Sequence, residues 1–164
     1  MVFVLDDIDE LGARRAIDSE KTIAHECINP TESDQFWDHW RFVEFALLTL
    51  YSRIVKGYEW ENLLGEFKKP LDEALWNAAG RGNREDPKNI VRTALHAGEH
   101  GGYMYVKDEG PGFDFLRQIR LIQQGDRHYH QNEGVGLMRF HKTPLHVAFH
   151  EGGSAVSIAT PYSK

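Results

Sequence analysis

The sequence contains a single cysteine, Cys27, and this scarcity excludes two kinds of small protein. One thiol cannot close an internal disulfide, and no second thiol provides the paired spacing of a zinc ribbon or a redox motif. Long apolar runs are also missing, since the most apolar stretch, 45–51, is far shorter than the ~20 residues of a membrane-spanning helix. We therefore expect a cytoplasmic protein without a membrane segment.

An excess of positive charge is missing as well. The chain has 19 Lys and Arg residues against 25 Asp and Glu residues, which gives a formal net charge of -6. A chain of this sign has no general attraction to nucleic acid or to anionic membranes. Its acidic N-terminus lacks the positive start of a signal peptide. We expect no direct nucleic-acid partner and no membrane partner.

The composition that remains is that of one globular domain. The 164 residues are 41 % hydrophobic and 27 % charged, which is ordinary for a chain that buries a core of its own. Residues 1–20 are acidic and hold few aromatic side chains, so we assign them to an N-terminal arm. The domain proper is expected over residues 21–164.

The first half of the domain is predicted to be mostly helical. Residues 21–28 read as a strand, and apolar residues then recur at three- and four-residue steps in a helix that ends near Gly57. A second helical piece is expected over 58–67. Proline is tolerated in the first turn of a helix, so Pro70 predicts the start of a third, over 71–79.

The second half is predicted to alternate hairpins and short helices. Segments 89–97 and 103–108 form an antiparallel hairpin, and a final hairpin turns at 151–153. Between them lie a short helix, 115–123, within a polar lid, and another helix that starts near Gly134. The expected class is α+β: a two-layer sandwich whose mixed, mostly antiparallel sheet is covered by helices on one face.

One pair of polar residues shares a face of the third predicted helix. Glu73 and Asn77 lie four residues apart, so both side chains project from the same side. An amide oxygen is a hard, neutral ligand suited to Mg²⁺, which fills its other positions with phosphate oxygens and water. The carboxylate one turn earlier is placed for general-base work on a hydroxyl or water that attacks a terminal phosphate.

Glycines mark two further segments. Asp108 ends a predicted strand and precedes Gly110 and Gly112, which lack a β-carbon and let the backbone approach a planar ligand. A carboxylate only accepts hydrogen bonds, which suits the exocyclic amine of adenine. Gly134 and Gly136 open a helix, where unshielded N–H groups can receive phosphates.

These segments resemble, in order, the motifs of a known ATPase family. The runs "EALWNAAGRGN", "VKDEGPGFD", "EGVGLM" and "EGGSAVSIA" are similar to the N-box, the two glycine boxes and the closing strand motif of the GHKL family of gyrase, heat-shock chaperones, histidine kinases and mismatch-repair ATPases. The likeness covers about residues 21–160. Within the family, "DEGPGFD" and the short chain look most like the anti-sigma factor serine/threonine kinases.

The resemblance implies a Bergerat-type fold that binds ATP with Mg²⁺. By position, Glu73 matches the general base and Asn77 the metal ligand, while Asp108 matches the adenine reader. The glycines of the two boxes are matched by Gly110, Gly112, Gly134 and Gly136. Ser154 stands where the family has a threonine beside the aspartate. Arg81 stands near the position of a family His or Lys and is a candidate phosphate contact.

The resemblance also implies partners and leaves alternatives open. A sigma factor or an antagonist protein would be the partner, which makes the chain a regulator of transcription, with a homodimer among the possible assemblies. A second reading is a nucleotide-gated binding module that transfers no phosphate. A third is a minimal histidine kinase, because "AHECINP" resembles a phospho-acceptor box with His25 as nucleophile; against it, few residues separate His25 from Asn77.

Overall fold

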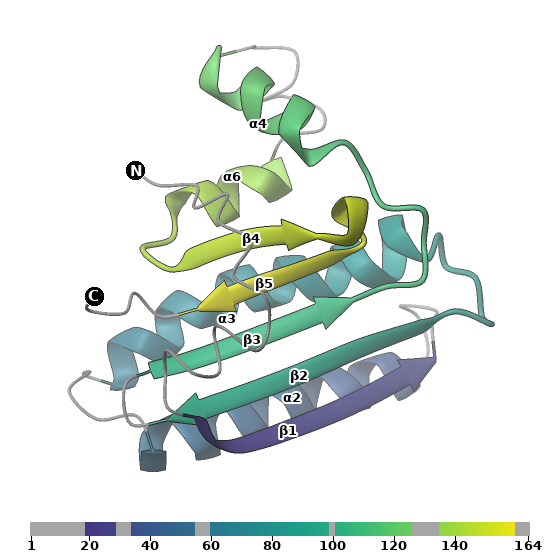
Figure 1. Cartoon of the computed structure of the whole chain (residues 1–164). Coiled ribbons are helices and arrows are strands. Elements are labelled where there is room, and N and C mark those ends of the chain that lie inside the picture. Colours follow the sequence, from purple (N-terminus) through teal and green to yellow (C-terminus); the bar gives the residue numbers. More distant parts are fainter. Residues whose placement is uncertain (1–18, 29–33, 55–59, 99–100, 126–134, 160–164) are drawn as a thin grey trace.

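The computed structural model describes residues 19–28, 34–54, 60–98, 101–125 and 135–159 (Figure 1). These segments form a sheet of five strands with helices packed against it, which is an α+β fold. The expected arm, 1–20, falls almost wholly outside the described residues, and β1 begins at its last two positions. Within the described segments, no helix is long and apolar enough to cross a bilayer.

The sheet has the order β1-β2-β3-β5-β4, and every neighbouring pair is antiparallel. The prediction of a partly parallel, mixed sheet is therefore wrong for the described strands. Hairpins join β2 to β3 and β4 to β5, whereas helices lie between β1 and β2 and between β3 and β4. The strands are β1 (Ser19–Ile28), β2 (Ile90–Gly98), β3 (Gly101–Lys107), β4 (His146–His150) and β5 (Ala155–Ala159). Both predicted hairpins, β2–β3 and β4–β5, are confirmed.

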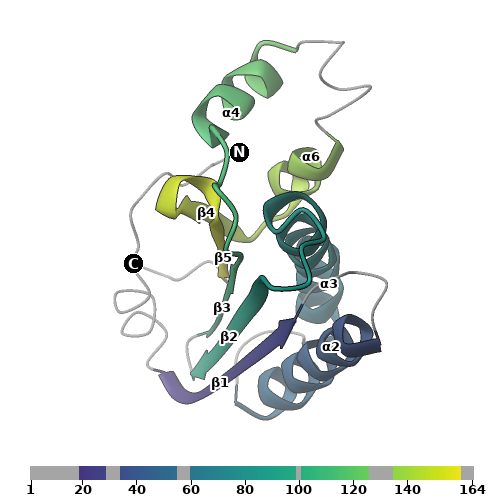
Figure 2. The same ribbon diagram turned by 90° about the vertical axis from the view of Figure 1, so that its right-hand side faces the viewer.

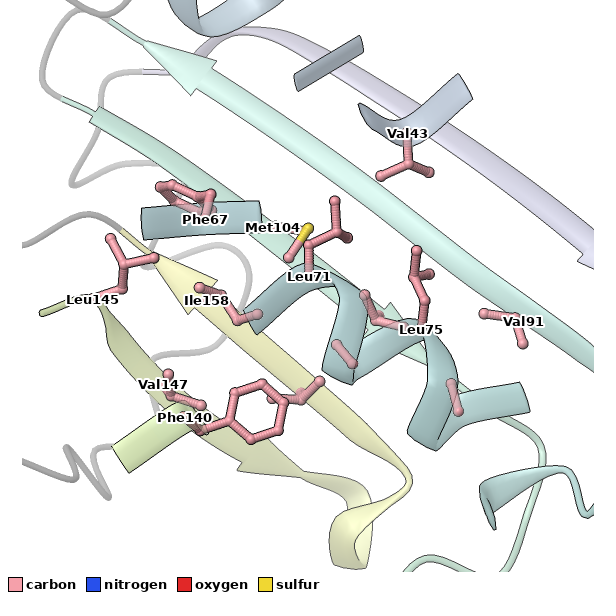
Figure 3. Packing of buried hydrophobic residues seen from close by; sticks show 14 of the residues in the cluster. Val43, Phe67, Leu71, Leu75, Val91, Met104, Phe140, Leu145, Val147 and Ile158 are labelled. Atoms are coloured by element: carbon pink, nitrogen blue, oxygen red, sulfur yellow. The ribbon is translucent and has the colours of Figure 1, made fainter. Parts of the chain in front are cut away.

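Two long helices pack on the same face of this sheet, α2 (Asp34–Ile54) and α3 (Trp60–Trp76) (Figure 2). On α3, Leu71 and Leu75 recur one turn apart, and both belong to the buried cluster that also contains Met104 of β3 (Figure 3). A buried hydrogen bond of 3.0 Å between His39 and Thr93 fastens α2 to β2. The core therefore lies between the helices and one face of the sheet.

The helix before the first hairpin differs from the prediction. Pro70 does not start a new helix but lies inside the single helix α3, where its ring is buried. Proline removes one backbone hydrogen bond, and burial of the ring within the core helps to offset that loss. The helix then widens into a π-helical turn, η1 (Asn77–Gly82), instead of stopping at Ala79. Such turns often occur at functional sites.

Two short helices complete the described structure. The predicted helix α4 (Phe115–Gln123) is confirmed, and Asp114 caps it by accepting a hydrogen bond of 2.9 Å from the Arg117 amide. The helix α6 (Val135–Lys142) is confirmed as well, and it packs against α3. Its buried Leu137 and Phe140 belong to the main core.

Candidate functional site

A cavity of about 380 Å³ opens where the end of α3, the turn η1 and the ends of β3 and β5 meet α4 and α6. Most of its lining is apolar or glycine, with a few polar side chains, which is the usual character of a small-ligand pocket. The polar lining residues are Asn77, Arg81, Asp108, Gln118 and Ser154. Segments far apart in the chain therefore bring Asn77 and Asp108 to one cavity.

Glu73 and Asn77 interact directly. The Asn77 side-chain nitrogen donates a hydrogen bond of 2.9 Å to Oε1 of Glu73, as the four-residue spacing on one helix face allows. Glu73 is only 8 % exposed, so this contact and the next satisfy a buried carboxylate. The nitrogen of the Asn77 side chain donates its hydrogen bond to Glu73. The oxygen of the same amide is therefore the atom that could bind a cation at the cavity.

The second oxygen of Glu73 is held by α6. Nη1 of Arg139 donates a hydrogen bond of 3.0 Å to Oε2 of Glu73 and forms an ion pair with it. Gly136, one turn before Arg139, lies so close that a methyl group there would overlap Oε1 of Glu73. The predicted glycine at 136 therefore packs against the Glu73 carboxylate and is not among the residues that line the cavity. Gly134 lies outside the described residues.

Asp108 directly follows β3 and is 7 % exposed. Its amide donates a hydrogen bond of 2.9 Å to the Ser154 carbonyl, and its Oδ1 accepts one of 2.8 Å from the Gly110 amide. Burial raises the pKa of the Asp108 carboxyl to about 6, although the Gly110 hydrogen bond and Lys107 act in the opposite direction. The second carboxylate oxygen is the atom available to a ligand.

Two glycines lie close to this carboxylate, and a third, Gly112, lies further along the same segment. A methyl group at Gly82 would overlap the Asp108 carboxyl, and one at Gly110 would overlap the Gly82 carbonyl. Gly112 has a φ of 70° and lies against the Gly152 carbonyl, so both its conformation and its surroundings require glycine. The "DEGPG" segment is therefore packed against η1 on one side and the β4–β5 turn on the other.

The remaining predicted residues differ in how they meet the cavity. Ser154 lines it, but its hydroxyl donates a hydrogen bond of 3.0 Å to the Glu151 carbonyl. Arg81 also lines it and is exposed, as a contact to an entering anion requires. His25 belongs to β1, where its backbone pairs with Thr93, as the predicted strand over 21–28 requires. The site prediction as a whole remains a prediction.

Several lining residues were missed by reasoning from the sequence. An aromatic wall of Phe113, Phe140 and Phe149 comes from three separate elements, with ring centroids 5.4 Å apart for Phe113 and Phe149 and 5.8 Å apart for Phe140 and Phe149. Gln118 of α4 also lines the cavity. Gly82 is in the run "GRGN", a local pattern that is typical of the end of a helix. Arg139 carried no local signal, because its partner is 66 positions away.

The lining of the cavity thus combines apolar side chains with a carboxylate, Asp108, an amide, Asn77, and an exposed guanidinium, Arg81. These groups suit a ligand that carries both a hydrogen-bond donor and negative charge. Comparison of the chain with protein-family models and with curated proteins finds no match.

Proposed function

We propose that the chain binds ATP with Mg²⁺ in this cavity and acts as a regulatory kinase of the anti-sigma type, which phosphorylates a serine or threonine of a partner protein. The corresponding architecture would be the Bergerat-type sandwich. The observation that carries the proposal is that Asp108 and Asn77 line one largely apolar cavity. Its volume of about 380 Å³ lies within the range of small-ligand pockets.

Recognition of the base rests on Asp108. Its free oxygen would accept a hydrogen bond from the exocyclic amine of adenine, while Val106 and Phe149 supply apolar contacts to the ring. Guanine carries an oxygen at that position and would place two acceptors against each other. The buried aspartate therefore supports ATP over GTP.

The polyphosphate end rests on Asn77 and Arg81. The amide oxygen of Asn77 is the hard ligand that would hold Mg²⁺, and the metal would neutralise charge on the phosphates. Arg81, exposed at the cavity, would contact a phosphate oxygen. Both residues belong to the π-helical turn η1, which places them on one wall.

Transfer would use Glu73 as the base. Its carboxylate would take the proton of the partner's hydroxyl as that oxygen attacks the terminal phosphorus and ADP leaves. Glu73 is joined to Asn77 by a hydrogen bond of 2.9 Å, so the base lies next to the metal ligand. That adjacency supports a reaction at the terminal phosphate.

One observation favours the second reading, a nucleotide-gated binding module. Both oxygens of Glu73 are engaged, one by Asn77 and the other by Arg139, and Gly136 packs against the same carboxylate. A carboxylate whose two oxygens already accept hydrogen bonds is less open to the hydroxyl of a partner. In this conformation the chain is better arranged to bind a nucleotide than to transfer its phosphate.

A protein partner is supported by the helical surface. Large apolar side chains are exposed on α2, among them Phe45 at 66 %, and on α3, where Trp76 is 40 % exposed. Exposed aromatic groups of this size are enriched at protein interfaces. Trp76 directly precedes Asn77, so such an interface would adjoin the candidate metal ligand.

Binding of ATP and GTP to the purified protein, with Mg²⁺ or with EDTA, tests the proposal by calorimetry. We expect ATP to bind, GTP to bind far more weakly, and Asp108→Asn to lose the preference, because its amide would present a donor to the amine. Transfer is then tested with γ-labelled ATP and candidate partner proteins. Label on a partner supports the kinase; binding without label supports the module; label on the chain that His25→Gln abolishes supports the histidine kinase.

A further inference from the structure

One buried hydrogen-bond acceptor in the cavity has no partner among the described residues. Gln118 lines the cavity from α4, and no described residue donates a hydrogen bond to its buried side-chain oxygen Oε1. A buried amide oxygen without a donor costs on the order of 1–3 kcal/mol, so native structures seldom leave one unsatisfied without a reason. The side chain is therefore a candidate for a contact that only a ligand completes.

The backbone around Gln118 is firmly placed. Its amide donates a hydrogen bond of 3.2 Å to the Asp114 carbonyl, and the Asp114 side chain caps the same helix. Ile119 and Ile122 are buried on the helix, which fixes its rotation. The position of Gln118 at the cavity thus follows from the packing of α4.

Gln118 is connected to the Asp108 end of the cavity. The segment that leads into α4 is tied to the β4–β5 turn, because the Phe113 amide donates a hydrogen bond of 2.9 Å to the Gly152 carbonyl. The same turn leads to Ser154, whose carbonyl accepts from the Asp108 amide. Gln118 and Asp108 therefore line one cavity from segments that both hydrogen-bond to the β4–β5 turn or the residue after it.

We propose that Gln118 is a specificity-determining residue whose Oε1 accepts a hydrogen bond from an N–H or O–H donor on the nucleoside part of the ligand. This inference rests on the proposed function. Phosphates at neutral pH offer only acceptors, so an unpartnered oxygen does not suit them. An adenine nucleoside offers two kinds of donor, the exocyclic amine of its base and the hydroxyls of its sugar.

The first test uses Gln118→Met, which keeps the length of the side chain and removes its oxygen. The free protein should become more stable, with a melting temperature about 2–4 °C higher, because a buried unpaired acceptor is gone. The affinity for ATP should fall roughly 2- to 12-fold, the equivalent of one lost hydrogen bond. Opposite changes in stability and affinity distinguish a ligand contact from a structural one.

The matched control is Gln123→Met, at an exposed position of the same helix. It should leave both the melting temperature and the ATP affinity unchanged. Equal ATP affinities for the wild type and Gln118→Met would overturn the inference. A loss of affinity that appears with Mg²⁺ and vanishes in EDTA would overturn it too, since Gln118 would then contact the metal.

The second test identifies the donor with ATP analogues that each lack one. For 2′-deoxy-ATP, 3′-deoxy-ATP and purine riboside triphosphate, the affinity ratio of wild type to Gln118→Met is measured. The ratio should fall to about one for the analogue that lacks the donor and persist for the others. A ratio that persists with all three overturns the assignment.

The two proposals fail in different ways. If the wild type binds ATP and Asp108→Asn weakens that binding while Gln118→Met does not, only the assignment of Gln118 is wrong. If the wild type binds no adenine nucleotide, the proposed function is wrong and the inference about Gln118 is wrong with it.

Discussion

The guanidinium of Arg139 on α6 donates a hydrogen bond of 3.0 Å to the carboxylate of Glu73 on α3. Glu73 is buried, whereas the side chain of Arg139 is about half exposed. The contact therefore joins the helix that carries the candidate base to the helix that follows residues 126–134. Any rearrangement of α6 would change the surroundings of Glu73.

The first prediction concerns this pair. Arg139→Met should lower the free energy of unfolding by about 1–2 kcal/mol, because the buried carboxylate of Glu73 loses a charged hydrogen-bond donor. The loss is no larger because Arg139 is half exposed and water screens the ion pair. Urea unfolding measures it. Arg117→Met, at an exposed position of α4, should change the free energy by less than about 0.5 kcal/mol. If both variants behave alike, the ion pair does not contribute to stability.

The second prediction separates binding from transfer. Asn77→Ala should weaken ATP binding at least about 10-fold in Mg²⁺ and change it little in EDTA, because its oxygen would be the metal ligand. Glu73→Ala should keep Mg²⁺-dependent binding and abolish transfer to a partner. Calorimetry and γ-labelled ATP provide the two measurements. An equal loss of ATP affinity in EDTA would show that Asn77 acts only by supporting Glu73.

The third prediction follows from the raised pKa of Asp108. The folded protein holds this proton more tightly than the unfolded chain, so its contribution to stability falls as the pH rises from about 4 through the folded pKa of about 6. The side chain of Asp108→Asn does not titrate, so the variant does not lose stability in this way as the pH rises. The free energy of unfolding of Asp108→Asn should therefore increase relative to that of the wild type over this pH range, by at most about 3 kcal/mol at higher pH.

Urea unfolding of wild type and Asp108→Asn between pH 4 and pH 8 checks this expectation. Asp72, whose pKa burial raises, and Glu151, whose pKa the Lys107 and Tyr105 hydrogen bonds lower, are present in both proteins, so their effects cancel in the difference. If the difference in free energy of unfolding between the two proteins is the same at every pH, the pKa of Asp108 is not raised by folding. Under the proposed function, Asp108→Asn should also bind ATP more weakly than the wild type above pH 6.

The fourth prediction compares two glycines with the same backbone conformation. Gly112 and Gly125 both have a φ of 70°, but only Gly112 lies against another backbone segment, at the Gly152 carbonyl. Gly125→Ala should therefore cost only about 1 kcal/mol of backbone strain. Gly112→Ala should cost about 1–3 kcal/mol more, because the β4–β5 turn must shift. Thermal unfolding of the two variants gives the comparison, and equal losses would contradict the close packing.

The sequence pattern of single segments predicted both hairpins and the short helices, because these elements form from residues that are close in the chain. Alternating side chains identified the hairpin of β2 and β3, and the capped, periodic run of α4 had the predicted bounds. The prediction that Pro70 starts a new helix was wrong. Proline is usually found in the first turn of a helix, but here it lies inside α3 with its ring buried. Local rules fail where tertiary packing compensates for an unfavourable residue.

The candidate site was harder to predict because its contacts join distant segments. The glycines near Asp108 were visible in the sequence, but the reason for Gly110, the carbonyl of Gly82 against it, was not. Nothing local to Gln118 or Arg139 indicates that one lines the cavity and the other holds Glu73. Such residues are found only once the chain is folded.

The register of the sheet also bears on how the chain assembles during synthesis. Strand β1 leaves the ribosome first, yet Ile28 pairs with Ile90 and Ser19 with Gly98. At ~5–20 residues per second, its partner strand follows only after several seconds. Until then the residues of β1 lack their partner strand in this sheet, and an unpaired strand edge is a template for pairing with another chain.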